Sequence, residues 1–132
     1  MMDGLLTYKE DGSTIGFEFK TKSNTPSQVK NIKEPQPSHI QQCVAYSLLF
    51  DVDEFLLVYE GVAKSKWSSN DEAYPDTKAF YVRPTEREKT WLLDKFAEVT
   101  RNVEDGELSR PDYSKCLFCP YKTICEEYGS GV

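Results

Sequence analysis

The chain has little of what marks a membrane-spanning, secreted or nucleic-acid-coating protein. No apolar run approaches the roughly 20 residues that a membrane helix needs, and the first residues lack the pattern of a secretory signal peptide. Basic residues are too few to balance the acidic ones, 16 against 22, so the net charge is -6. This charge argues against a protein that coats nucleic acid through bulk electrostatics. It does not exclude a site at which a bound divalent cation reverses the local field.

Four of the 132 residues are cysteines. Without a secretory signal, cysteines indicate an intracellular metal site or free thiols before they indicate disulfides. We therefore expect a cytoplasmic protein. The length is that of one domain able to bury its own core.

The first part of the chain predicts a β-hairpin, with strands at 2–9 and 14–21. The pair Asp11-Gly12 between them is typical of a two-residue hairpin loop. With that loop, Gly4 lies opposite Phe19, and one face of the hairpin becomes an apolar stripe that we expect to face the core. The stripe consists of Leu6, Tyr8, Ile15, Phe17 and Phe19.

The other face of this hairpin gathers charged side chains. In the predicted register Asp3 lies directly across from Lys20, and Glu18 lies on the diagonal. Two carboxylates can hold Mg²⁺ or Mn²⁺, and a lysine beside them can orient or activate a water molecule. The competing interpretation is an ordinary solvated face that carries charges.

The remaining chain alternates polar loops with periodic segments, which predicts an α/β fold. Ser38 is the expected N-cap of a first helix. Thr85 and Glu88 form the expected capping box at the start of a second, longer helix, and Gly106 is expected to end it. We expect a loop at 23–38, a helix at 39–50, a buried central strand at 54–61, a loop at 62–76, a strand at 77–83 and a helix at 85–104.

We expect a mixed sheet of about four strands with both helices packed on it. Residues 1–109 would form this core, and 110–132 would form a cysteine-bearing tail packed on it. The predicted core residues are Leu6, Phe17, Phe19, Val44, Leu48, Leu56, Val58, Phe80, Val82, Leu92 and Phe96, with Trp91 as a further core aromatic.

The first helix carries a polar face as well as an apolar one. His39, Gln42 and Tyr46 lie along one side at helical spacing, and Val44 and Leu48 lie on another side suited to the core. An ordinary helix surface explains the polar side equally well when it is taken alone. His39 is interpreted as a helix-start or surface residue rather than a ligand.

The tail holds three cysteines at a spacing typical of metal sites, C-x₂-C followed by a third Cys after five residues: Cys116, Cys119 and Cys125. The spacing is shared by zinc and iron–sulfur sites, and packed free thiols are the alternative. Three ligands need a fourth, and Cys43 is the only other cysteine. We interpret Cys43 as a small buried core thiol.

The ordered set Asp3-Gly4, Glu18-Phe19-Lys20-Thr21 and Gln42-(x)₃-Tyr46 resembles the PD-(D/E)XK nuclease superfamily. Within it, the sequence is similar to the RecB-type exonuclease branch, which includes viral exonucleases and the CRISPR adaptation nucleases. The cysteine tail resembles the iron–sulfur closure of many of those proteins. The resemblance covers nearly the whole chain, and the order of the motifs is more specific than any one of them.

This resemblance implies a restriction-endonuclease-like core and Mg²⁺- or Mn²⁺-dependent hydrolysis of DNA. Asp3 and Glu18 would be metal ligands together with the backbone carbonyl of Phe19, and Lys20 would act on the hydrolytic water and the phosphate charge. Gln42 and Tyr46 would contact the substrate or the ligand shell. The three tail cysteines would hold a [4Fe–4S] cluster in preference to zinc.

The sequence departs from the family pattern at its start. The helix that usually precedes the Asp strand, and the upstream cysteine that usually completes the cluster, are not in it. We expect either a fragment of a longer protein or a reduced site, with an exposed apolar surface near the first strand that a second copy or a protein partner covers. The alternative functions are a non-catalytic nucleic-acid or partner-binding module with the nuclease fold, and a small metal-stabilised interaction domain.

Overall fold

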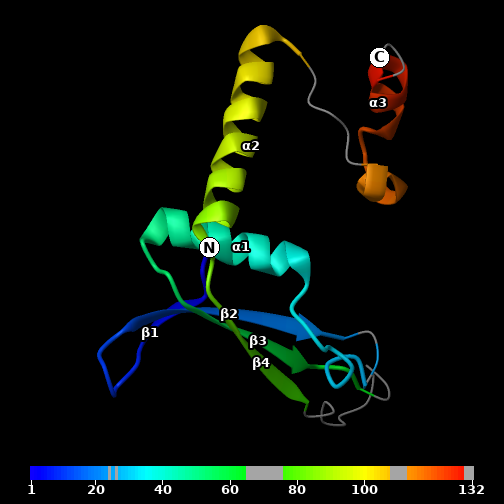
Figure 1. The fold of residues 1–132 in the computed structure, drawn as a ribbon. Helices are drawn as coiled ribbons and strands as arrows, with labels where there is room; N and C mark the ends of the chain where they lie inside the picture. The colour runs from blue at the N-terminus through cyan, green and yellow to red at the C-terminus, as the bar shows by residue number, and fades with distance from the viewer. Residues whose placement is uncertain (24, 26, 65–75, 108–112, 130–132) are drawn as a thin grey trace. The chain divides into compact units, whose positions relative to one another are not determined.

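A computed structural model describes residues 1–23, 25, 27–64, 76–107 and 113–129 (Figure 1). The elements, in chain order, are β1 (Gly4–Thr7), β2 (Thr14–Lys22), α1 (Pro37–Phe50), β3 (Phe55–Gly61), β4 (Thr77–Val82), α2 (Glu86–Asp105), the 3₁₀-helix η1 (Tyr113–Phe118) and α3 (Lys122–Gly129). The chain divides into two compact units, Met1–Leu92 and Leu93–Val132. The predicted boundary at residue 109 lies outside the described residues. Among those residues, no helix combines the length and apolarity that crossing a membrane requires.

The sheet has four strands in the order β1-β2-β3-β4. Strands β1 and β2 are antiparallel, β2 and β3 are parallel, and β3 and β4 are antiparallel. A parallel pair cannot be joined by a tight turn, so the long connection that contains α1 carries the chain from the end of β2 back to the start of β3. The predicted α/β class with a mixed sheet is confirmed.

The hairpin register differs from the predicted one by two residues. Gly4 pairs with Phe17 rather than with Phe19. The predicted two-residue loop is wrong because Tyr8 and Ser13 close the turn: the Tyr8 N–H donates to the Ser13 carbonyl at 2.9 Å. The loop is therefore residues 9–12, stabilised by the Asp11 carboxylate, which accepts the Ser13 N–H at 2.8 Å. Because the shift is even, every side chain keeps its predicted face.

The core lies on the sheet face that α1 covers. Strand β3 supplies Phe55, Leu57 and Tyr59, each 0% exposed. Opposite Phe55, β2 supplies Gly16, where an added Cβ would lie 2.4 Å from the Phe55 ring. The buried cluster consists of Val29, Cys43, Tyr46, Val52, Phe55, Leu57, Tyr59 and Val82.

The predicted hairpin stripe faces away from this core, so that part of the core prediction is wrong. Leu6 and Phe19 are 43% and 41% exposed, because α1 packs on the opposite face, where Glu18 is buried. Leu48, Phe96 and Trp91 are exposed too, contrary to prediction. Val44, Val82 and Leu92 are buried as predicted, and Phe80 packs on the core cluster. Phe17, Leu56 and Val58 are half-buried.

The helix starts show how well local capping signals predict structure. Thr85 and Glu88 form the predicted capping box, with the Thr85 N–H donating to Glu88 Oε2 at 2.8 Å, and Gly106 ends α2 with a φ of +71°. The predicted Ser38 cap is wrong: α1 begins at Pro37, two residues before the predicted start at residue 39, and Gln36 is its N-cap. Proline is favoured at the first helical position because its missing N–H has no intrahelical partner there.

Candidate functional site

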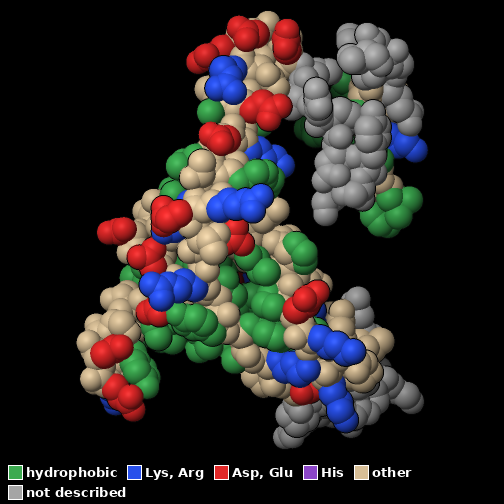
Figure 2. Space-filling view, in the orientation of Figure 1, with side chains coloured by type: hydrophobic (Ala, Val, Ile, Leu, Met, Phe, Trp, Pro, Cys, Tyr) green, Lys and Arg blue, Asp and Glu red, His purple; other side chains and the backbone are tan. Residues whose placement is uncertain are grey.

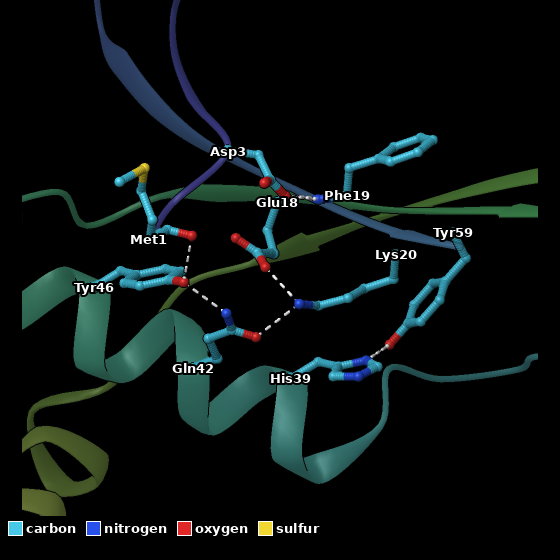
Figure 3. A network of polar contacts seen from close by, with 9 residues as sticks. All are labelled: Met1, Asp3, Glu18, Phe19, Lys20, His39, Gln42, Tyr46 and Tyr59. Atoms are coloured by element: carbon cyan, nitrogen blue, oxygen red, sulfur yellow. Dashed lines mark hydrogen bonds and ion pairs between the residues drawn. The ribbon is translucent and has the colours of Figure 1, made fainter. Parts of the chain in front are cut away.

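A hydrogen-bonded network of polar side chains lies between β2 and α1 in the first unit (Figure 3). Glu18 and Lys20 project from β2, Gln42 and Tyr46 project from α1, and Asp3 lies just before β1. The network exists because residues 18 and 20 share one face of a strand and residues 42 and 46 are one helical turn apart. Five of the predicted site residues therefore lie in one place.

Glu18 is the buried acid of this network, with 2% of its surface exposed. Its Oε1 accepts a hydrogen bond from Lys20 Nζ at 2.5 Å. Its Oε2 is buried and has no hydrogen-bond partner among the described residues. A buried carboxylate oxygen without a donor is costly, and a cation placed against it removes that cost.

Lys20 is held between two acceptors. Its Nζ donates to Glu18 Oε1 and, at 2.8 Å, to Gln42 Oε1. An ammonium group has three donors, so one remains to reach a substrate oxygen. The Lys20 side chain is 21% exposed, so this cation is partly accessible from solvent.

Gln42 and Tyr46 continue the network toward the start of the chain. Gln42 Nε2 donates to the Tyr46 hydroxyl at 2.6 Å, and that hydroxyl donates to the Met1 carbonyl at 2.8 Å. Tyr46 is 6% exposed. In this structure the two residues therefore orient Lys20 and tie α1 to the segment that leads to Asp3.

Asp3 lies at the exposed edge of the network. Its Oδ2 accepts the backbone N–H of Phe19 at 2.8 Å, which fixes the carboxylate beside β2. Continuing the observed register by one residue places Asp3 opposite Glu18, whereas the predicted register placed it opposite Lys20. The two acids are thus neighbours across the hairpin.

These donors suit a hard divalent cation. Mg²⁺ binds through one or two carboxylates and keeps several waters, so Asp3, Glu18 and the Phe19 carbonyl form an adequate donor set. The described residues contain no group of three or more His, Cys, Asp or Glu side chains placed to hold a metal. The set named here has only two such side chains, and its third donor is a backbone carbonyl. The orphaned Glu18 oxygen is the observation that favours a cation here.

His39 lies one helical turn before Gln42, and its partner is a residue that sequence reasoning missed. The Tyr59 hydroxyl lies 2.7 Å from His39 Nδ1 and also accepts the Gln36 N–H at 3.1 Å. Burial, together with the ammonium groups of Lys20 and Lys22, lowers the pKa of His39. The alternation of β3 marks Tyr59 as a buried position, but nothing local in the sequence pairs it with His39.

The cysteines behave differently in the two units. Cys43 is fully buried, and burial raises its pKa to about 11, so it is the core thiol that was predicted. Cys116, Cys119 and Cys125 are half-buried. The described residues do not gather them into a group that could hold a metal.

Comparisons with known proteins agree with this fold. The family model described as PD-(D/E)XK nuclease superfamily matches residues 2–126. A solved structure titled "Crystal structure of SSO0001" is similar in fold, with a TM-score of 0.55 and 18% sequence identity. That similarity covers 96% of this chain and 50% of the solved one, so the chain spans half the length of that protein. The search of curated proteins returned no match.

Proposed function

The chain belongs to the PD-(D/E)XK nuclease superfamily, and we propose that it is a Mg²⁺- or Mn²⁺-dependent deoxyribonuclease of the RecB-type exonuclease branch. The observation that carries this proposal is the buried Glu18 carboxylate, which shares one oxygen with Lys20 and leaves the other without a donor. A buried ion pair stabilises a fold only when further hydrogen bonds satisfy its remaining lone pairs, and Glu18 Oε2 has none among the described residues. The substrate is DNA, and we expect the protein to act in the cytoplasm.

In this proposal Asp3 and Glu18 hold the cation together with the Phe19 carbonyl. A bound Mg²⁺ or Mn²⁺ would supply Lewis-acid chemistry at the scissile phosphate. Asp3 is suited to the role because the Phe19 N–H already orients its carboxylate. Glu18 is suited because its burial keeps bulk water away from the oxygen that would meet the ion.

Lys20 would act on the substrate with its remaining donor. Glu18 and Gln42 fix the position of its ammonium group, so little reorganisation is needed when charge develops on the phosphate. Gln42 and Tyr46 would act through Lys20 and the Met1 segment, as positioning residues. The predicted contact of these two residues with the substrate or the ligand shell stays a prediction.

Cleavage of end-labelled DNA in Mn²⁺ tests the proposal. Wild type should cleave, Glu18→Gln should not, and Glu98→Gln, which removes the same charge from an exposed position on α2, should match wild type. Metal-dependent DNA binding without cleavage by wild type would contradict the enzyme and support the non-catalytic binding module instead.

The [4Fe–4S] cluster stays a prediction for Cys116, Cys119 and Cys125. Cys43 is a poor fourth ligand, because a ligand must be a thiolate and this thiol is buried with a raised pKa. Iron and sulfide analysis of anaerobically purified protein tests the cluster. A colourless protein without iron would remove the cluster from the proposal, and zinc in its place would support the alternative.

The exposed apolar side of the hairpin supports the expected partner. Leu6, Tyr8 and Phe19 are 43%, 45% and 41% exposed. We expect a second copy or a protein partner to cover this surface, since exposed apolar patches tend to mark interfaces. Light scattering at high protein concentration tests self-association, and a strictly monomeric chain would count against a second copy.

A further inference from the structure

A second polar cluster lies beside the catalytic network, at the start of α1. It consists of Lys22, Gln36, His39 and Tyr59. Tyr59 is 0% exposed and packs its ring against His39, with centroids 5.5 Å apart. The proposed nuclease mechanism uses none of these four residues.

The hydrogen bonds of Tyr59 select one tautomer of His39. The Tyr59 oxygen accepts the Gln36 N–H, so its own proton is best used toward His39 Nδ1. With Nδ1 as acceptor, a neutral imidazole carries its proton on Nε2. Burial and the nearby lysines lower the pKa of His39, which favours the neutral ring. His39 thus presents an N–H donor on the ring edge that faces away from Tyr59.

Lys22 places a cation at the same cluster. Its Nζ lies 5.5 Å from the centre of the Tyr59 ring and donates to Gln36 Oε1 at 3.3 Å. Lys22 follows Lys20 by two residues, so both share the α1 side of β2, about 6.6 Å apart along the strand. The first turn of α1 contains no acidic residue.

Charge is also unevenly distributed over this acidic protein. Figure 2 shows Lys and Arg side chains gathered over the end of the sheet where β2 leads into α1. Lys78 lies in this region, where its Nζ donates to the carbonyls of Lys30 and Ile32, in the connection between β2 and α1. An anion approaching the cluster therefore meets positive charge despite the net charge of -6.

We propose that Lys22 and His39 Nε2–H form a phosphate-binding subsite for the substrate strand, next to the phosphate at Lys20. The proposal rests on the proposed nuclease function and extends it from the scissile bond to the neighbouring backbone. Two residues of strand advance by about 6.6 Å, which puts Lys22 within reach of the phosphate that neighbours the one at Lys20. Tyr59 is a positioning residue that fixes the His39 tautomer.

The competing explanation is structural: Tyr59 and His39 could serve only to tie the first turn of α1 to β3. Binding of an end-labelled oligothymidylate in metal-free buffer, measured by fluorescence anisotropy against salt concentration, separates the two. Lys22→Gln should lower the slope of log K against log salt by about 0.7, the value for one single-strand phosphate contact. Lys9→Gln, which removes the same charge from the exposed hairpin loop, should leave the slope unchanged.

His39→Ala should give a different result because a neutral donor releases no counterion. We expect affinity to fall about tenfold at every salt concentration, with the slope retained. Equal slopes in wild type and Lys22→Gln would overturn the subsite. So would His39→Ala with wild-type affinity.

The tautomer can be read directly because His39 is the only histidine in the chain. The NMR chemical shifts of the two ring nitrogens should show a protonated Nε2 in the free protein. The chemical shift of Nε2 should change when the oligothymidylate binds. Tyr59→Phe should mix the tautomers, and unchanged nitrogen shifts in this variant would overturn the positioning role. DNA cleavage by wild type is scored separately, so a protein that binds through Lys22 but does not cleave would refute the nuclease and keep the subsite.

Discussion

Glu18→Gln should separate metal binding from folding. The substitution keeps the shape of the side chain and an oxygen for Lys20, but it removes the charge that a divalent cation needs. In wild type, Glu18 Oε2 is buried without a partner among the described residues, so a cation that binds there stabilises the folded state only. We therefore expect Mn²⁺ to raise the unfolding temperature of wild type and to leave that of Glu18→Gln unchanged.

The size of the shift follows from linkage. At a metal concentration of about 100 times Kd, binding to the folded state alone contributes about 2.7 kcal/mol. For 132 residues the unfolding entropy is about 0.28 kcal/mol/K, so this free energy corresponds to a rise of about 10 °C. Calorimetric titration of Mn²⁺ supplies Kd, and thermal unfolding followed by circular dichroism supplies the shift.

The control is Glu98→Gln, because it removes the same charge from an exposed position on α2. This variant should keep the full response to Mn²⁺. If Glu18→Gln were stabilised by Mn²⁺ as much as wild type, Glu18 would not be a ligand, and the argument from its orphaned oxygen would be refuted.

Three further predictions concern the groups around this carboxylate and the start of α2. Lys20→Met should keep the thermal response to Mn²⁺ but slow cleavage by about 10²–10⁴-fold in single-turnover assays, since the lost donor acts on developing charge. Tyr46→Phe leaves Gln42 Nε2 without its acceptor and should lower the urea-unfolding free energy by about 1–2 kcal/mol. Thr85→Ala removes the α2 cap and should cost about 1 kcal/mol in the same measurement without affecting Mn²⁺ affinity.

The location of the network was predictable because it depends on short-range periodicities. Strand alternation places Glu18 and Lys20 on one face, and helical spacing places Gln42 and Tyr46 on one side of α1. Even the wrong hairpin register kept Asp3 on the correct face, because the error was two residues. The pairing of Tyr59 with His39 was not predictable, since it depends on how α1 lies across β3.

The buried face of the sheet was predicted wrongly because β2 itself carries the stronger apolar pattern on the other side. Phe17 and Phe19 mark that side as a core face, yet β3 provides the larger buried groups on the opposite one. What allows this arrangement is Gly16, whose missing side chain leaves room for the Phe55 ring. A glycine inside a strand is a weak signal in a sequence, and its meaning depends on a ring about forty positions further along the chain.

The choice of face also explains why we expect the site to respond to cations. A strand that placed its phenylalanines under α1 would hold Glu18 and Lys20 in solvent, where an ion pair contributes little and water would satisfy the carboxylate. The observed strand does the reverse: it exposes Phe19 and buries Glu18. Exposing Phe19 and burying Glu18 both lower the stability of the fold. We therefore expect this arrangement only where the buried carboxylate has a function other than stabilising the fold. A cation held against Glu18 Oε2 is such a use, because it would recover on binding the solvation that the carboxylate lost on folding.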